Sequence, residues 1–147
     1  MQNGDYFALE QPIVDQLKTI DGIEAVYTHF SIEDMMQGAT VSPSVSVIYI
    51  DDRIGETLNN GQVNCIYQQW LIVLAVEEAG SQLENTIEIR KKASPFIIEV
   101  IKKLQGFDAG LVGVDVLQRA NAGVQHMSAA GKLWIPFLFE AKIFNVN

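Results

Sequence analysis

One segment constrains the fold more than any other: an apolar strand pattern that leads directly into a long helical pattern. Residues 65–76 begin with a mixture of polar and apolar side chains and end wholly apolar, from Trp70 to Val76. Such a run is typical of a strand with one face in water at its start and both faces covered at its end. From about Gln82 to Leu104 the apolar spacing becomes helical. The segment therefore predicts a covered sheet with a long helix packed against it.

The long helical pattern contains a proline and is followed by a glycine. Pro95 cannot donate a helical hydrogen bond, and the pair Ser94-Pro95 is compatible with the start of a second half-helix. Gly106 stands where a C-cap glycine belongs. The segment therefore predicts a long helix that ends at Gly106, and a second half-helix beginning at Ser94-Pro95 stays open.

Length and composition predict one domain with a substantial core. The chain has 147 residues, of which 48% are hydrophobic and 19% are charged, so we expect a single domain over residues 1–147. The charged fraction is below average for a globular protein, and the mean hydropathy is +0.14. Two interpretations stay open: some apolar surface is covered by partners, or a compact monomer has a well-filled core.

The N-terminal part predicts a helix, a strand and a short helix. Apolar side chains follow helical spacing over residues 6–20, and Pro12 predicts either a kink or a helix that begins near it. Residues 23–29 alternate as a short strand. Ser31, placed before Glu33-Asp34, predicts a capped helical turn to about Gln37, with Met35 and Met36 as apolar filler.

Two further alternating segments predict an antiparallel hairpin. They are Val45–Asp51 and Gln62–Glu77. Between them, Ile54–Gly61 has a turn-like composition and ends in Asn60-Gly61, a strong turn signal. We expect a long hairpin loop here. Since binding residues are disproportionately found on loops held by a rigid scaffold, its tip is a candidate partner contact.

The C-terminal part predicts two more strands separated by a loop. A strand begins at Val114, Ala120–Gly131 is small and polar, and Lys132–Phe144 alternates as a closing strand. Pro136 predicts a sheet edge, a bulge or a position on the non-bonded side of that strand. Together the elements predict an α+β fold: a mostly antiparallel sheet with a long helix and an N-terminal helix packed on one side.

Charge and cysteine content exclude several functional classes. The net charge is −8, from 18 acidic and 10 basic residues, which disfavours a grip on nucleic acid or on an anionic membrane. Cys65 is the single cysteine, so no disulfide forms within the chain, and we expect a buried, inert thiol. The start of the chain has no basic region and no apolar signal core. The apolar run Trp70–Val76 is too short to cross a bilayer.

No motif for catalysis is present in the sequence. Gly131-Lys132 lacks the remaining parts of a phosphate-binding loop, and His29 and His126 have no paired metal ligand nearby in sequence. Asp51 and Asp52 are adjacent in a strand pattern, so they point to opposite faces. We therefore predict a protein that is not an enzyme, with no cofactor and no metal. The alternative is an unrecognised small hydrolase that uses Asp51 or His126.

Five segments carry a resemblance to a known family. Tyr6–Leu17 resembles its opening helix, Val45–Tyr49 with Tyr67–Val73 its central hairpin, Ile97–Phe107 its long helix with a Leu-x-Gly-aromatic exit, and Trp134–Phe139 its closing strand. In the order of these elements the chain resembles the tail terminator (tail completion) proteins of long-tailed bacteriophages and prophages.

The resemblance implies a structural virion protein. Such a protein forms a hexameric ring that caps the head-proximal end of the tail tube, stops tube polymerisation and offers a docking surface to the head connector. The implied partners are other copies of the chain, the tail tube protein, and sheath or neck proteins; DNA only passes through the lumen, and no membrane is involved. Assembly would take place in the bacterial host cytoplasm. A ring of acidic subunits would give a negative lumen that lets DNA pass without adhering.

Contacts to tube, sheath or neck proteins are expected at the Ile54–Gly61 hairpin tip and in the Ala120–Gly131 loop, and the acidic run Glu33-Asp34 is expected to face a neighbour. Two alternatives stay open: another phage neck or minor tail subunit of similar fold, and a small non-enzymatic protein-binding adaptor that is monomeric or dimeric. The candidate interface residues are Asp51, Asp52, Arg53, Glu56, Asn59, Asn60, Gln125 and His126.

Overall fold

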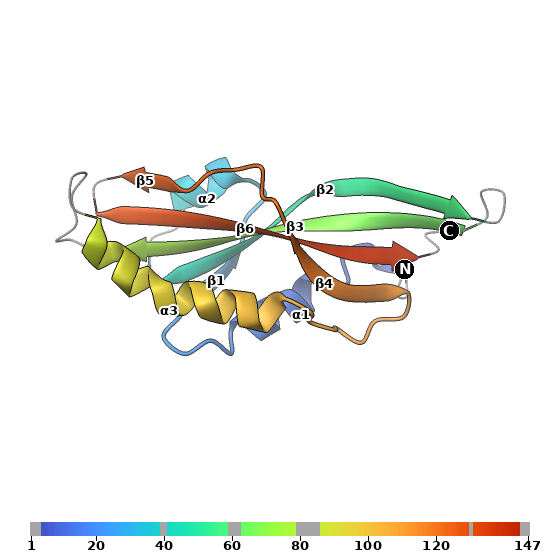
Figure 1. The fold of residues 1–147 in the computed structure, drawn as a ribbon, viewed down its shortest axis with the longest axis horizontal. Coiled ribbons are helices and arrows are strands. Elements are labelled where there is room, and N and C mark those ends of the chain that lie inside the picture. Colours follow the sequence, from blue (N-terminus) through green and yellow to red (C-terminus); the bar gives the residue numbers. More distant parts are fainter. Residues whose placement is uncertain (1–3, 39–40, 59–62, 79–85, 130, 145–147) are drawn as a thin grey trace.

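A single mixed sheet contains every strand that the structure describes (Figure 1). The computed structural model describes residues 4–38, 41–58, 63–78, 86–129 and 131–144. The strands lie in the order β1-β2-β3-β6-β4, and β5 also pairs with β6. β1 runs parallel to β2, and the other pairs are antiparallel, which confirms the predicted mostly antiparallel α+β fold. In chain order the elements are α1 (Glu10–Leu17), β1 (Ala25–Thr28), α2 (Ile32–Gly38), β2 (Ser44–Leu58), β3 (Val63–Glu77), α3 (Ile87–Leu104), β4 (Val114–Ala120), β5 (Met127–Ala129) and β6 (Lys132–Phe144).

Helices cover both faces of the sheet. α1 and α3 pack on one face, which we call the α1/α3 face, as predicted for the long and N-terminal helices. The short helix α2 packs on the opposite face, called the α2 face, through Met35 against Ile48, Leu71 and Val73. Met36 was expected to pack as well, but its side chain is 46% exposed because only one side of α2 faces the sheet.

The inner part of β3 forms the centre of the core. Trp70, Ile72 and Leu74 point to the α1/α3 face, and Leu71 and Val73 point to the α2 face. All five are at most 1% exposed. The predicted strand with both faces covered at its end is therefore confirmed. Burial of these side chains is the main term that holds the sheet to its helices.

Two helix predictions are settled by the positions of prolines. α1 begins at Glu10, so Pro12 lies in its first turn, where backbone N–H groups have no partner within the helix. α3 is one continuous helix with Pro95 inside it, which confirms the predicted long helix and excludes a second half-helix beginning at Ser94-Pro95. Pro95 is on the exposed side, while Ala93 and Phe96 on either side of it still face the core. Gly106 has a φ of 76°, which confirms the predicted C-cap.

The predicted long hairpin loop is largely strand. β2 continues to Leu58, so Ile54, Thr57 and Leu58 pair with β3, and the rest of the predicted loop after Leu58 lies outside the described residues. Two register shifts, between Tyr49 and Asp51 and between Ile54 and Thr57, explain the error. A bulge breaks the two-residue alternation from which strands are recognised in a sequence.

The closing strand β6 has the predicted bounds, and its neighbours explain Pro136. One side of β6 pairs with β3 along the whole length of β6. The other side of β6 pairs with β5 near its start and with β4 near its end. Pro136 lies in the gap between these two, so its missing N–H breaks no bond on that side. The Ala120–Gly131 segment is therefore not entirely a loop, because Met127–Ala129 form β5.

Candidate interaction surfaces

The candidate interface residues lie in two separate parts of the structure. Asp51, Asp52, Arg53 and Glu56 are on the outer half of β2, beyond its pairing with β1. Gln125 and His126 are exposed and directly precede β5. In Figure 1 β5 lies on the left and the far end of β2 on the right. Asn59 and Asn60 lie outside the described residues.

A bulge sets which way the outer side chains of β2 point. Asp51 pairs with Gln69, Asp52 with Gln68 and Arg53 with Tyr67. Since Gln68 shares the α1/α3 face with Trp70, Asp52 lies on that face, and its neighbours in β2 lie on the α2 face. The two adjacent carboxylates therefore diverge, as the sequence predicted.

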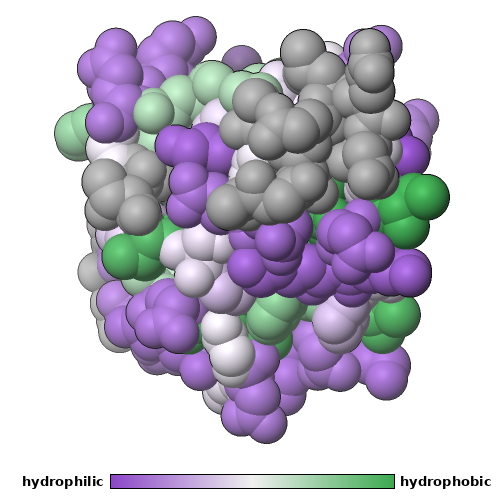
Figure 2. Space-filling view, turned by 90° about the vertical axis from the view of Figure 1, so that its left-hand side faces the viewer, coloured by the Kyte–Doolittle hydropathy of each residue, from purple (hydrophilic) through white to green (hydrophobic). Residues whose placement is uncertain are grey.

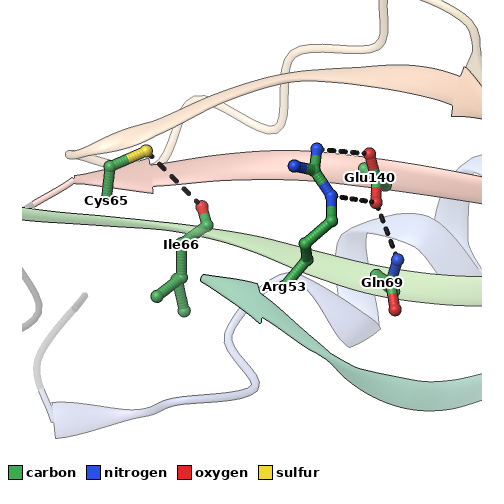
Figure 3. A network of polar contacts seen from close by, with 5 residues as sticks. All are labelled: Arg53, Cys65, Ile66, Gln69 and Glu140. Atoms are coloured by element: carbon green, nitrogen blue, oxygen red, sulfur yellow. Dashed lines mark hydrogen bonds and ion pairs between the residues drawn. The ribbon is translucent and has the colours of Figure 1, made fainter. Parts of the chain in front are cut away.

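On the α2 face, Arg53 forms a polar network with β3 and β6 (Figure 3). Arg53 donates from Nε to Glu140 Oε2 at 3.2 Å and from Nη2 to Oε1 at 3.1 Å, and Gln69 Nε2 donates to Oε2 at 2.7 Å. The Arg53 guanidinium also lies 4.0 Å from the centre of the Tyr67 ring. The hydrogen bond from Arg53 is the largest influence on the pKa of Glu140 and lowers it; burial opposes this effect, and the hydrogen bond from Gln69 lowers the pKa further. The network fixes the orientation of a cation at the surface.

On the α1/α3 face, Gln68 joins the N-terminal segment to the sheet. Its side chain is fully buried, donates to the Tyr6 carbonyl at 3.0 Å and accepts from the Trp70 indole at 3.1 Å. The Tyr6 hydroxyl donates to Asp52, and burial raises the pKa of this carboxyl. The residues before α1 are thereby held against the outer half of β2.

The hairpin also depends on one close approach between its strands. A Cβ on Gly55 would lie 2.8 Å from the Cys65 carbonyl oxygen and 3.0 Å from the Tyr67 ring. No side chain fits there, so only glycine allows this second bulge. Cys65 is buried, as predicted, and its thiol lies 3.9 Å from the Ile66 carbonyl oxygen (Figure 3).

The second candidate surface is a groove beside β5, with a volume of about 490 Å³. Its floor is apolar, and His126, Arg90 and Lys132 contribute polar groups to its rim. Figure 2 looks onto this end of the molecule, where apolar side chains form separate areas among hydrophilic ones. The floor consists of Ile89, Ala93, Ile97, Leu133 and Ile135.

Sequence reasoning missed the residues that organise the outer half of the sheet. Glu140 lies in a strand pattern far from Arg53 in sequence, and no local signal relates the two. Gln68 and Gln69 were visible as polar residues at the start of an apolar run. Two glutamines directly before a covered strand are a usable signal, because a buried polar side chain requires hydrogen-bond partners.

Within the described ranges, no group of three or more His, Cys, Asp or Glu side chains is arranged to hold a metal ion. None of the helices described is long and apolar enough to cross a membrane.

The fold and these surfaces define a class: an α+β protein with one long sheet, helices on both faces and candidate interaction surfaces at two ends, one polar and one a groove with an apolar floor. The chain belongs to the phage tail terminator family, since the model of the family described as "Phage tail terminator protein" matches residues 2–145. The predicted resemblance is thus confirmed, and the protein is a structural phage tail protein by family. The comparison with curated proteins found no match.

Solved structures agree with this fold. A chain of the structure titled "Virion of native gene transfer agent (GTA) particle" matches with a TM-score of 0.61 and 19% sequence identity. The match covers 94% of this chain and 96% of that chain. At this identity the likeness shows a shared fold.

Proposed function

We propose that the chain is a tail terminator subunit that acts as a single domain over residues 1–147. Six copies would form a ring at the head-proximal end of a phage tail tube, end tube growth and offer a docking surface to the head-neck connector. The family match over residues 2–145 is the observation that supports this proposal most directly. A solved chain with the same fold comes from a structure whose title names a virion.

The outer half of β2 is the surface that we assign to the tube or neck. From Ile48 to Leu58 no described strand pairs with its outer edge. Bulges and charges on an edge strand oppose uncontrolled strand pairing, and this edge has both. Hydrogen bonds to Glu140 hold the Arg53 guanidinium in place before a partner arrives. This lowers the side-chain conformational entropy that is lost on binding.

The acidic composition suits a ring around DNA. Each subunit has a net charge of −8, and a lumen with negative charge repels the phosphate backbone. DNA would pass through the ring without being bound. The other partners would be the tail tube protein and sheath or neck proteins, with assembly in the bacterial host cytoplasm.

Tube capping tests the proposal directly. Purified chain is added to polymerising tail tube protein, and tube lengths and ends are measured by negative-stain electron microscopy. We expect shorter tubes whose ends carry a ring with a central hole. Light scattering after size-exclusion chromatography would give the mass of the chain alone at several concentrations. Tubes of unchanged length with bare ends would contradict the proposal.

A charge reversal tests the role of β2 in the same assay. Glu56→Lys changes an exposed side chain on the outer half of β2, and we expect weaker capping. Asp21→Lys, at an exposed turn after α1, is the matched control and should cap like the unmodified chain. Equal capping by both variants would exclude Glu56 from the contact.

A further inference from the structure

The groove beside β5 combines an apolar floor with unbalanced positive charge. Lys132 lies 3.5 Å from the Glu77 carboxylate, whereas Arg90 forms no ion pair with another described residue. Ala93 in the floor is a small side chain, which leaves depth between α3 and β6. A segment that fits here would present apolar side chains next to a carboxylate.

Such a segment exists on the opposite face of the same chain. Phe30, two residues before α2, is 96% exposed, and Met36 on α2 is 46% exposed. Glu33 and Asp34 are also exposed. Glu33 and Met36 are three residues apart in a helix and so lie on one side of it. We call Phe30, Glu33, Asp34 and Met36 the α2 knob.

We propose that the α2 knob of one copy docks in the β5 groove of the next copy. This inference rests on the proposed ring and names the surfaces that close it. Phe30 and Met36 cover the apolar floor, and Glu33 lies against Arg90. The charges are complementary, since the knob has two carboxylates and no Lys or Arg, and complementary charge fixes the register of an interface.

The placement of the two surfaces makes this a contact between copies. α2 packs on one face of the sheet, and the groove lies between α3 and the sheet on the other. A chain therefore cannot fill its own groove with its own knob. Because the two patches differ, the contact is heterologous, and its repetition generates a ring when the rotation closes.

A charge swap within one chain tests the pairing. Arg90→Glu and Glu33→Arg are each expected to weaken self-association, measured by sedimentation velocity, by about tenfold. The variant with both changes restores the attraction, because each copy then supplies both reversed partners. Lys102→Glu, on an exposed part of α3 outside the groove, is the control and leaves association unchanged. Circular dichroism would verify that each variant folds.

The apolar half of the contact is tested separately. Phe30→Ser removes a side chain that makes little contact within the subunit, so association should fall while the free energy of unfolding stays the same. Ile98→Ser, at a 49% exposed position of α3, is the matched apolar control.

Covalent trapping separates this inference from the ring itself. The double variant Gln37→Cys with Ser128→Cys places one thiol on an exposed position of α2 beside the knob and one at the groove, and leaves Phe30 in place. Treated with a short bis-maleimide, it should give a ladder of products that ends at the closed ring. Each single variant should give dimers at most. If the chain forms a ring that survives the charge swaps and gives no ladder, this inference is overturned and the ring stands. If the chain neither associates nor gives a ladder, both are overturned.

Discussion

The two halves of β3 show how one strand serves two purposes. From Trp70 to Val76, side chains on both faces of the strand pack into the hydrophobic core, and their burial stabilises this half of the strand. From Cys65 to Gln69 the same strand carries Gln68 on one face and Gln69 on the other, both held by hydrogen bonds to other elements. The inner half supplies stability, and the outer half presents a surface of fixed geometry.

The largest effect is expected where both faces are covered. Ile72→Ala removes a fully buried side chain from the centre of the core and should lower the free energy of unfolding by about 2–5 kcal/mol. Urea unfolding followed by circular dichroism measures this loss. A loss below about 1 kcal/mol would mean that the inner half does not dominate stability.

Gln68 should have the largest effect on the outer half. Gln68→Ala leaves the Trp70 indole N–H and the Tyr6 carbonyl without their buried partner, at an expected cost of about 1–3 kcal/mol. The same unfolding experiment measures it. Gln69→Ala, next to it on the half-buried opposite face, is the control and should cost less. An equal cost for both would remove the distinction between the two faces.

The two carboxylates on opposite faces should respond to pH in opposite directions. The pKa of Glu140 is lowered below 4.5 by Arg53, so its stabilisation is present above that value and is lost as pH falls through the lowered pKa. Burial raises the pKa of Asp52 above 3.8, so its ionisation destabilises the fold as pH rises from 3.8 through the raised pKa. The free energy of unfolding should be measured between about pH 3 and 6, a range around the ordinary pKa values of these groups. The loss of stability at low pH should vanish in Glu140→Gln, and the loss with rising pH should vanish in Asp52→Asn. Unchanged slopes in both variants would argue against this assignment.

The smallest effect is expected at the exposed edge of the hairpin. Ile54 is 77% exposed, so Ile54→Ala should change the free energy of unfolding by less than about 0.5 kcal/mol. Tube capping is the informative measurement for this variant, since the side chain belongs to the surface that we assign to a partner. Loss of stability comparable to that of Gln68→Ala would show that the outer edge is part of the core.

The sequence predicted the parts of this fold that follow a regular period. The bounds of β6 and the covered half of β3 came from alternation, and the end of α3 came from Gly106. The outer half of β2 was missed because its two bulges interrupt the alternation. β5 was missed because Met127–Ala129 is too short to show an alternating pattern in the sequence. It forms a strand only by pairing with β6.

The sequence predicted which segments carry the candidate interface residues, but it did not predict which residues those side chains contact. Arg53 was chosen from the sequence, but its partner Glu140 is 87 residues away. Such pairs depend on the register between strands, which a hydrophobic pattern fixes only after the topology is known. His126 was chosen from a loop and lies on the rim of a groove whose floor comes from α3 and β6.

The position of β6 also has a consequence for the order of folding. β6 lies between β3 and β4, and both precede it in the chain. The hairpin of β2 and β3 can form from neighbouring segments, but one side of β3 remains an open edge until β6 arrives. A chain still emerging from the ribosome would therefore expose the backbone of its most apolar strand, and such an edge promotes aggregation. Sheet closure is then a late, long-range event, and a subunit becomes competent to join others only after it.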